Sequence, residues 1–211
     1  DLYKFLGVSL FGAPKWWPRH GDHNGGKGKH INLESDLLPG LYPTSSDLYC
    51  LSSLLMARTG WNAATTFGLD CSRPEAWSRS YSDELVWMFS YKDRAGCWQD
   101  TISPVNHATH SYQIVTRLIN RSSCLRKLVK EDPARCGVPD IALKSPWLCI
   151  QDSTRIGVLG QHSMYQIRRY LTKIIQKYNV EEDAKMKLPV FKPSDFRDVF
   201  ADAVHRGGNY S

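Results

Sequence analysis

The sequence has no apolar run long enough to span a bilayer, no C-x-x-C pair and no internal repeat. These absences argue against a membrane-spanning protein, a zinc-ribbon protein and a repeat solenoid. No secretory signal pattern is present either, so we expect a cytoplasmic protein without a membrane partner. The six cysteines are scattered, and most lie inside apolar segments, which predicts buried free thiols in a reducing compartment.

A metal site is not expected. His20, His23 and His30 flank a glycine-rich stretch at residues 21–29, but no cysteine or carboxylate pattern there would complete a ligand set. We interpret the stretch as a flexible polar loop. The sequence therefore predicts no metal and no cofactor.

The composition is that of an ordinary globular domain. The 211 residues are 42% apolar and 23% charged, which is enough apolar content for one substantial core. The net charge of +6 is compatible with a polyanionic partner, and equally with a mildly basic soluble protein.

The hydrophobic pattern predicts a mostly α protein with a small antiparallel β-sheet (α+β). Residues 1–43 read as a loop-rich lead-in, and residues 44–211 as one domain. Helical spacing marks 44–58, with Ser45 or Ser46 as its cap, then 62–69, 110–129 and 162–178, and a last helix that opens at 193–195. Two strand pairs are expected at 84–91 with 97–102, and at 147–151 with 155–159. Along 162–178, Ile167, Leu171, Ile174 and Ile175 are expected to face the core.

Three separate segments resemble the sequence boxes of tyrosine recombinases, the phage-integrase family. The first is Thr59-Gly60-Trp61-Asn62, where the family has a T-G-x-R turn. The second is a lysine at a hairpin tip, here Lys92 in Tyr-Lys-Asp-Arg-Ala-Gly. The third is Ser194-Asp-Phe-Arg197, where the family has H-x-L-R. The resemblance covers about residues 36–211 and implies the recombinase catalytic-domain fold.

The sequence departs from the family at several positions. Asn62 stands where the family has an arginine, Thr65 where it has an acidic residue, and Ser194 where it has a histidine. The family's third box, with the tyrosine nucleophile, is expected beyond Ser211, and Tyr210 is interpreted as an ordinary loop residue.

The resemblance implies an enzyme that cleaves and religates double-stranded DNA through a phosphotyrosine intermediate. It assigns Arg197 to a clamp on the phosphate oxygens and Lys92 to general acid catalysis, with Asn62 or Arg58 completing the clamp and Ser194 donating to the phosphate. Each of these residues also has an ordinary structural interpretation. Arg197 can form an ion pair with a neighbouring aspartate, Lys92 can be a turn lysine, and Ser194 can be a helix cap.

Further basic residues are candidates for contacts with the DNA backbone. They are Arg94 near the hairpin tip, and Arg168, Arg169 and Lys173 on the face of one helix. The seven tryptophans are expected in the core rather than as platforms for stacked bases. By the resemblance, the partners are duplex DNA and further copies of the chain assembled on it.

Two other functions stay open. Because Asn62, Thr65 and Ser194 depart from the family, the chain can be a catalytically degenerate recombinase that binds DNA as a structural or regulatory module. It can also be an unrelated helical interaction domain that matches the boxes by chance.

Overall fold

The computed structural model describes residues 38–92, 95–152, 155–181 and 187–190, and in addition 192, 194–196, 198 and 200–202. Within these residues the chain forms helices together with two small antiparallel sheets, so the expected α+β class is confirmed. The loop predicted at residues 21–29, its three histidines and the rest of residues 1–37 lie outside the described part.

The helices are α2 (Leu38–Leu41), α3 (Ser45–Thr59), α4 (Ala63–Phe67), α5 (Ser111–Arg121), α6 (Ser123–Glu131), α7 (Pro133–Cys136) and α8 (Met164–Glu181). Short 3-10 turns connect them at η2 (Pro74–Ala76), η4 (Asp140–Leu143) and η5 (Gln161–Ser163). The last predicted helix is present as well, because the described residues at 195–196, 198 and 200–202 are helical.

The larger sheet has the strand order β1-β2-β3, with β1 (Ser78–Ser80), β2 (Leu85–Lys92) and β3 (Cys97–Pro104) all antiparallel. The smaller sheet pairs β4 (Leu148–Asp152) with β5 (Arg155–Val158). Both predicted strand pairs are confirmed. The short strand β1 was not predicted, because its sequence, Ser-Arg-Ser, has neither apolar alternation nor β-branched residues.

The capping interactions at the two ends of α3 explain where this helix begins and ends. The Thr44 side chain accepts the backbone N–H of Asp47, and the Thr44 backbone N–H donates to the Asp47 carboxylate at 2.9 Å. This reciprocal capping box makes Thr44 the cap, instead of the predicted Ser45 or Ser46. At the other end, Gly60 adopts φ 66°, a left-handed conformation that glycine takes without steric cost.

Two groups of buried side chains form the core. The first joins α3, α5 and the larger sheet, and contains Leu48, Leu55, Met88, Leu118 and Trp147 among others. The second joins α6 to the smaller sheet and includes Tyr42, which is 1% exposed. In addition, the Ile150 backbone N–H donates to the Pro43 carbonyl. Tyr42 and Pro43 therefore attach the end of the lead-in to the folded core.

Two details of the helices differ from the sequence prediction. The single helix expected at 110–129 is two helices, which meet at Ser122, where the backbone has φ −87° and ψ 0°. The buried Ser122 hydroxyl donates to the Leu118 carbonyl at 2.7 Å, and the Ser122 backbone N–H donates to the same carbonyl at 3.0 Å. On α8, Ile167 and Ile175 are buried as predicted, but Ile174 is 42% exposed.

The cysteines are free, as expected, but fewer are buried than predicted. Cys136 and Cys149 are buried and Cys71 is partly buried, whereas Cys50, Cys97 and Cys124 are exposed.

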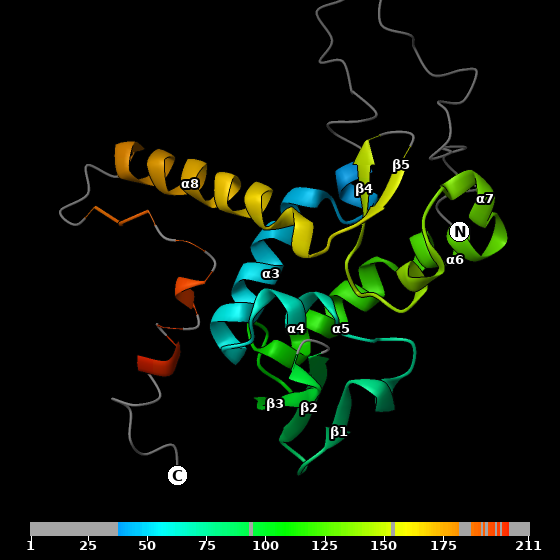
Figure 1. Cartoon of the computed structure of the whole chain (residues 1–211), viewed down its shortest axis with the longest axis horizontal. Helices are drawn as coiled ribbons and strands as arrows, with labels where there is room; N and C mark the ends of the chain where they lie inside the picture. Colours follow the sequence, from blue (N-terminus) through cyan, green and yellow to red (C-terminus); the bar gives the residue numbers. More distant parts are fainter. Residues whose placement is uncertain are drawn as a thin grey trace, which may run out of the picture.

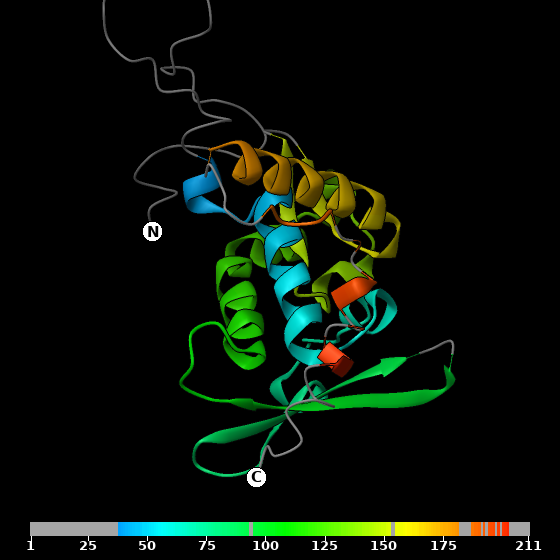
Figure 2. The same ribbon diagram turned by 90° about the vertical axis from the view of Figure 1, so that its left-hand side faces the viewer.

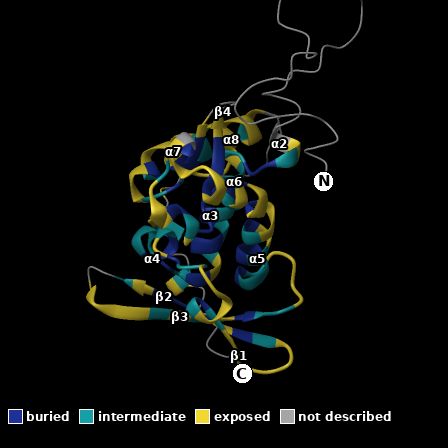
Figure 3. Ribbon diagram, turned by 90° about the vertical axis from the view of Figure 1, so that its right-hand side faces the viewer, coloured by how far each residue is buried: buried dark blue, intermediate teal, exposed yellow. Residues whose placement is uncertain are grey.

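The larger sheet lies at one end of the molecule, with the helices on one side of it (Figures 1 and 2). Helix α8 crosses α3 at the other end, and α3 runs from α8 toward the sheet (Figure 1). The buried residues concentrate where α3 and α5 face each other and where both approach the sheet (Figure 3). As a result, the α3–α4 turn lies near the sheet.

Candidate functional site

The first box forms the sharp turn between α3 and α4. After Gly60, the Trp61 backbone N–H donates to the Thr59 hydroxyl at 3.1 Å, and that hydroxyl donates to the Leu55 carbonyl at 2.8 Å. Thr59 and Trp61 are both buried. The turn is therefore held by buried hydrogen bonds, and it fixes where α4 starts.

Asn62 is the N-cap of α4. Its Oδ1 accepts the backbone N–H of Thr65 at 3.0 Å. Because a backbone N–H requires an oxygen as its partner, this bond also fixes the orientation of the amide. The Asn62 Nδ2 group has no partner among the described residues, so its two N–H donors remain available to a ligand.

Thr65 connects this cap to the β2–β3 hairpin. The Thr65 side chain is fully buried, and its hydroxyl lies 2.5 Å from Oε1 of Gln99 on β3. The Ser90 hydroxyl on β2 donates to the Thr65 carbonyl at 2.8 Å. Since side chains alternate along a strand, the Lys92 side chain points to the same side of the sheet as the Ser90 side chain, toward α4. Lys92, at the end of β2, is half-buried.

The C-terminal helical segment packs against the same turn. The Phe200 ring lies so close to Gly60 that a β-carbon on this glycine would be 2.5 Å from Phe200 Cδ1. The helical segment that follows the third box thus packs against the first box, although about 140 residues separate Gly60 from Phe200 in the sequence.

Within the third box, the structure describes Ser194 but not Arg197, which lies outside the described residues. Ser194 is exposed, and its hydroxyl donates to Asp195 Oδ1 at 3.3 Å. The other oxygen of Asp195 accepts the Lys192 backbone N–H at 2.7 Å. This hydrogen bonding orders the segment just before the helical residues begin.

Arg58 lies one helical turn before Asn62, on the exposed side of α3. Partial burial lowers the pKa of His110 below its ordinary 6.5, and the nearby charges of His107 and Arg58 lower it further. The rings of His107 and His110 pack edge to face, 4.4 Å apart. Arg58 is therefore close to the start of α5, where its charge acts on this histidine pair.

The predicted DNA-backbone contacts on α8 are Arg168, Arg169 and Lys173. All three are exposed on the helix that crosses α3, as predicted for a solvated basic face (Figure 1). Arg94, the candidate next to the hairpin tip, lies outside the described residues.

Sequence reasoning missed two contributors to the site. Thr65 was noted only as a missing acidic residue, yet it joins the α4 cap to the hairpin. Phe200 was not considered at all. Phe200 packs on a glycine that adopts a left-handed conformation, and the two residues are far apart in the sequence. A single sequence does not show that they are in contact.

The tryptophan prediction is correct in part. Trp61, Trp77 and Trp147 are buried, but Trp87 and Trp98 are 38% and 61% exposed on the larger sheet. The remaining tryptophans, at positions 16 and 17, lie outside the described residues.

In the part of the chain that the structure describes, no group of three or more histidine, cysteine or acidic side chains has the arrangement of a metal site. None of the described helices combines the length and apolar character needed to cross a bilayer. No family model, curated protein or solved structure matches the chain.

Proposed function

We propose that this chain is the catalytic domain of a tyrosine-type site-specific DNA recombinase. The observation that carries the proposal is the packing of Phe200 on Gly60, because it brings the first and third boxes of the resemblance together. The Asn62–Thr65–Gln99 contacts add the hairpin to the same region. Contacts from the hairpin and from the C-terminal helical segment thus both reach the α3–α4 region, and they support a phosphate site assembled from the three segments.

In this function a DNA phosphate binds at the α3–α4 turn. The Asn62 Nδ2 group, whose orientation is fixed by the α4 cap, donates to one non-bridging oxygen. Arg197 supplies the positive charge, since a guanidinium offers paired donors that match a phosphate. Ser194, exposed at the start of the same segment, is a further donor.

The reaction itself is a phosphoryl transfer. A tyrosine oxygen attacks phosphorus and loses its proton, the bond from phosphorus to the 5′-oxygen breaks, and the leaving oxygen takes a proton. Lys92 is the proposed donor of that proton, because it ends β2 on the side of the sheet that faces α4. Religation reverses these steps with a different 5′-hydroxyl, so the chemistry needs no cofactor or metal.

Asn62 also supports a second candidate function, that of a degenerate recombinase which binds duplex DNA without cutting it. Asn62 carries no charge, and its oxygen serves the fold by capping α4. Without the charge of the family's arginine, the clamp loses about 1.5–3 kcal/mol of charge-assisted hydrogen bonding.

The test is covalent capture on a nicked suicide substrate, with protein expressed from the whole reading frame. We expect the wild-type protein to form a covalent complex and Arg197→Ala to abolish it with unchanged helical content by circular dichroism. Arg117→Ala, an exposed arginine on α5, is the matched control. Capture at the wild-type level by Arg197→Ala removes this residue from the mechanism.

Two further outcomes separate the alternatives. A wild-type protein that binds duplex DNA but forms no covalent complex is the degenerate module. A wild-type protein that binds no duplex even at low salt, where phosphate contacts are strongest, is neither, and the interaction-domain interpretation then replaces both.

A further inference from the structure

The outer face of the larger sheet carries a group of large aromatic side chains. Strand β2 presents Val86, Met88 and Ser90 to the core, and all three are buried. The alternate residues point the other way, as the two-residue period of a strand requires. They are Trp87, Phe89 and Tyr91 on β2, with Trp98 opposite Tyr91 on β3. We call these four residues the aromatic face.

The four rings of the aromatic face form one continuous series. Ring centroids are 5.6 Å apart for Trp87 and Phe89, 5.6 Å for Phe89 and Trp98, and 5.3 Å for Tyr91 and Trp98. Phe89 is covered by its neighbours, but Tyr91 is 42% exposed and Trp98 is 61% exposed. Such a concentration of exposed aromatic surface marks a place where a ligand or partner binds.

Two interactions fix the orientation of these rings. The Trp87 indole N–H donates to Asp100 Oδ2 at 2.7 Å, which holds the indole plane against β3. The Arg79 guanidinium lies over the Phe89 ring, 5.4 Å from its centroid. Trp87 and Phe89 are therefore held in place before any ligand arrives, which reduces the entropic cost of binding.

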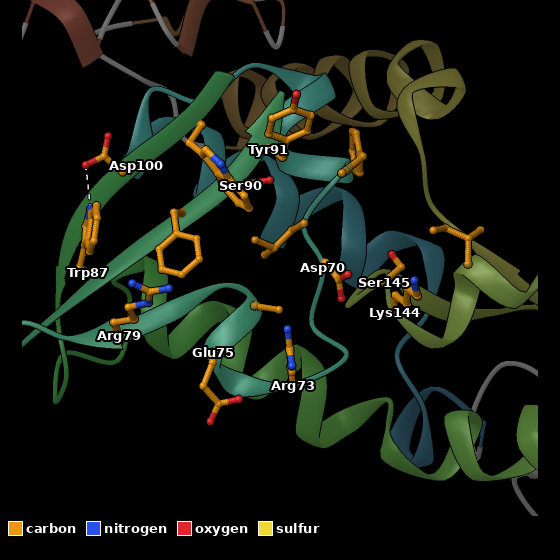
Figure 4. Close-up of a pocket in the computed structure, with 17 residues that line it drawn as sticks. Asp70, Arg73, Glu75, Arg79, Trp87, Ser90, Tyr91, Asp100, Lys144 and Ser145 are labelled. Carbon is orange, nitrogen blue, oxygen red and sulfur yellow. Dashed lines mark hydrogen bonds between the residues drawn. The ribbon is translucent and has the colours of Figure 1, made fainter. Parts of the chain in front are cut away.

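The aromatic face borders a groove of about 1020 Å³ between the sheet and the segments around residues 67–79 and 141–145 (Figure 4). Arg73, Arg79 and Lys144 line this groove. Asp70, Glu75 and Asp100 line it as well, so its acidic and basic side chains are equal in number. Asp100 binds Trp87, Asp70 accepts the Ser72 backbone N–H at 2.8 Å, and Glu75 points away from the groove in Figure 4.

We propose that the groove and its aromatic face bind single-stranded DNA. Exposed rings next to cationic side chains are the combination that such strands require, because unpaired bases stack on the rings while the phosphates meet the cations. A duplex does not fit this description, since its bases already stack on one another.

The location relative to the proposed reaction supports the same ligand, and here the inference rests on the proposed function. Cleavage frees a strand with a 5′-hydroxyl end, which must leave its duplex before it joins another. Tyr91 directly precedes Lys92, the proposed donor to that 5′-oxygen. Because side chains alternate along β2, Tyr91 points to the opposite face of the sheet from Lys92, so unpaired bases that pass the end of the hairpin would reach the aromatic face.

The test measures fluorescence anisotropy with labelled oligothymidylate and, separately, with a labelled duplex of equal length. We expect Trp98→Ala to weaken binding of the single strand about 5- to 100-fold and to leave duplex binding unchanged. Tyr91→Ala is expected to act in the same direction. Tyr165→Ala is the control, because Tyr165 is an equally large aromatic residue, 71% exposed on α8 and away from this face.

Trp98 is largely exposed, so its replacement is not expected to unfold the chain, and circular dichroism checks this. Single-strand affinity that is unchanged in both Trp98→Ala and Tyr91→Ala overturns the inference. The same holds if the wild-type protein fails to bind the single strand at low salt. Loss of covalent capture with retained, Trp98-dependent single-strand binding would instead refute the proposed function alone.

Discussion

The contact between Gly60 and Phe200 can be tested by replacing both residues, alone and together. In Gly60→Ala, two costs arise. The alanine must adopt the left-handed conformation seen at φ 66°, and its β-carbon would lie 2.5 Å from Phe200 Cδ1, well inside the contact distance of two carbon atoms. The ring therefore has to move away, and the C-terminal segment loses its packing on the α3–α4 turn.

The magnitudes follow from these two costs. The left-handed conformation costs an alanine about 1–2 kcal/mol, partly offset because alanine restricts the unfolded chain more than glycine does. Removing a buried phenylalanine side chain costs about 3–5 kcal/mol, and we take about 2 kcal/mol for the partly buried Phe200. Gly60→Ala should then cost about 3 kcal/mol and Phe200→Ala about 2 kcal/mol.

The double variant distinguishes this account from independent effects. Once Phe200 is alanine, the clash at Gly60 disappears, so the double variant should cost about 3 kcal/mol rather than the sum of about 5 kcal/mol. The free energy of unfolding in urea, measured for all four proteins, gives the coupling directly. If the two costs add to within about 0.5 kcal/mol, Phe200 does not lie on Gly60, and the observation that carries the proposed function is lost.

Two further predictions concern stability near the site. Asn62→Ala should lower the free energy of unfolding by about 1 kcal/mol, because α4 loses its cap. Asn62→Asp keeps an acceptor for the Thr65 N–H, so its free energy of unfolding should stay near that of the wild type. Equal losses in the two variants would contradict the capping role. The lowered pKa of His110 means that the unfolded chain binds more protons than the folded chain as pH falls below about 6.5. The free energy of unfolding should therefore decrease over this range in the wild type and decrease less in His110→Gln, and parallel pH profiles for the two proteins would contradict the shift.

Local sequence signals located most of the elements. The capping residues before α3, the apolar alternation of β2 and the turn chemistry after Lys92 each depend on neighbours a few residues away, and all three predicted the observed structure to within a few residues. The break at Ser122 was missed because the amphipathic pattern continues through it.

The arrangement of the site depends on contacts that no local pattern encodes. The hydrogen bonds of Thr65 to Gln99 and to Ser90 join residues that are 34 and 25 positions apart, respectively. The exposure of Trp98 follows from which face of β3 meets the helices, and strand alternation alone leaves that choice open when both faces carry apolar residues. For this reason the tryptophans on the sheet were assigned to the core.

The structure also gives a physical reason for the most serious departure from the family pattern. Helix α4 has only five residues, and its first turn depends on the acceptor that Asn62 supplies. An arginine side chain has donors only, so at position 62 it would leave the Thr65 N–H without this bond. Here the chain has a cap where the family has a charge, and the cap orients the Asn62 amide outward. Arg58, the other candidate for this charge, lies near His110 at the start of α5 and lowers the pKa of that histidine. Under the proposed function, the positive charge at the phosphate comes mainly from Arg197 and Lys92, and removal of Arg197 is therefore expected to abolish cleavage.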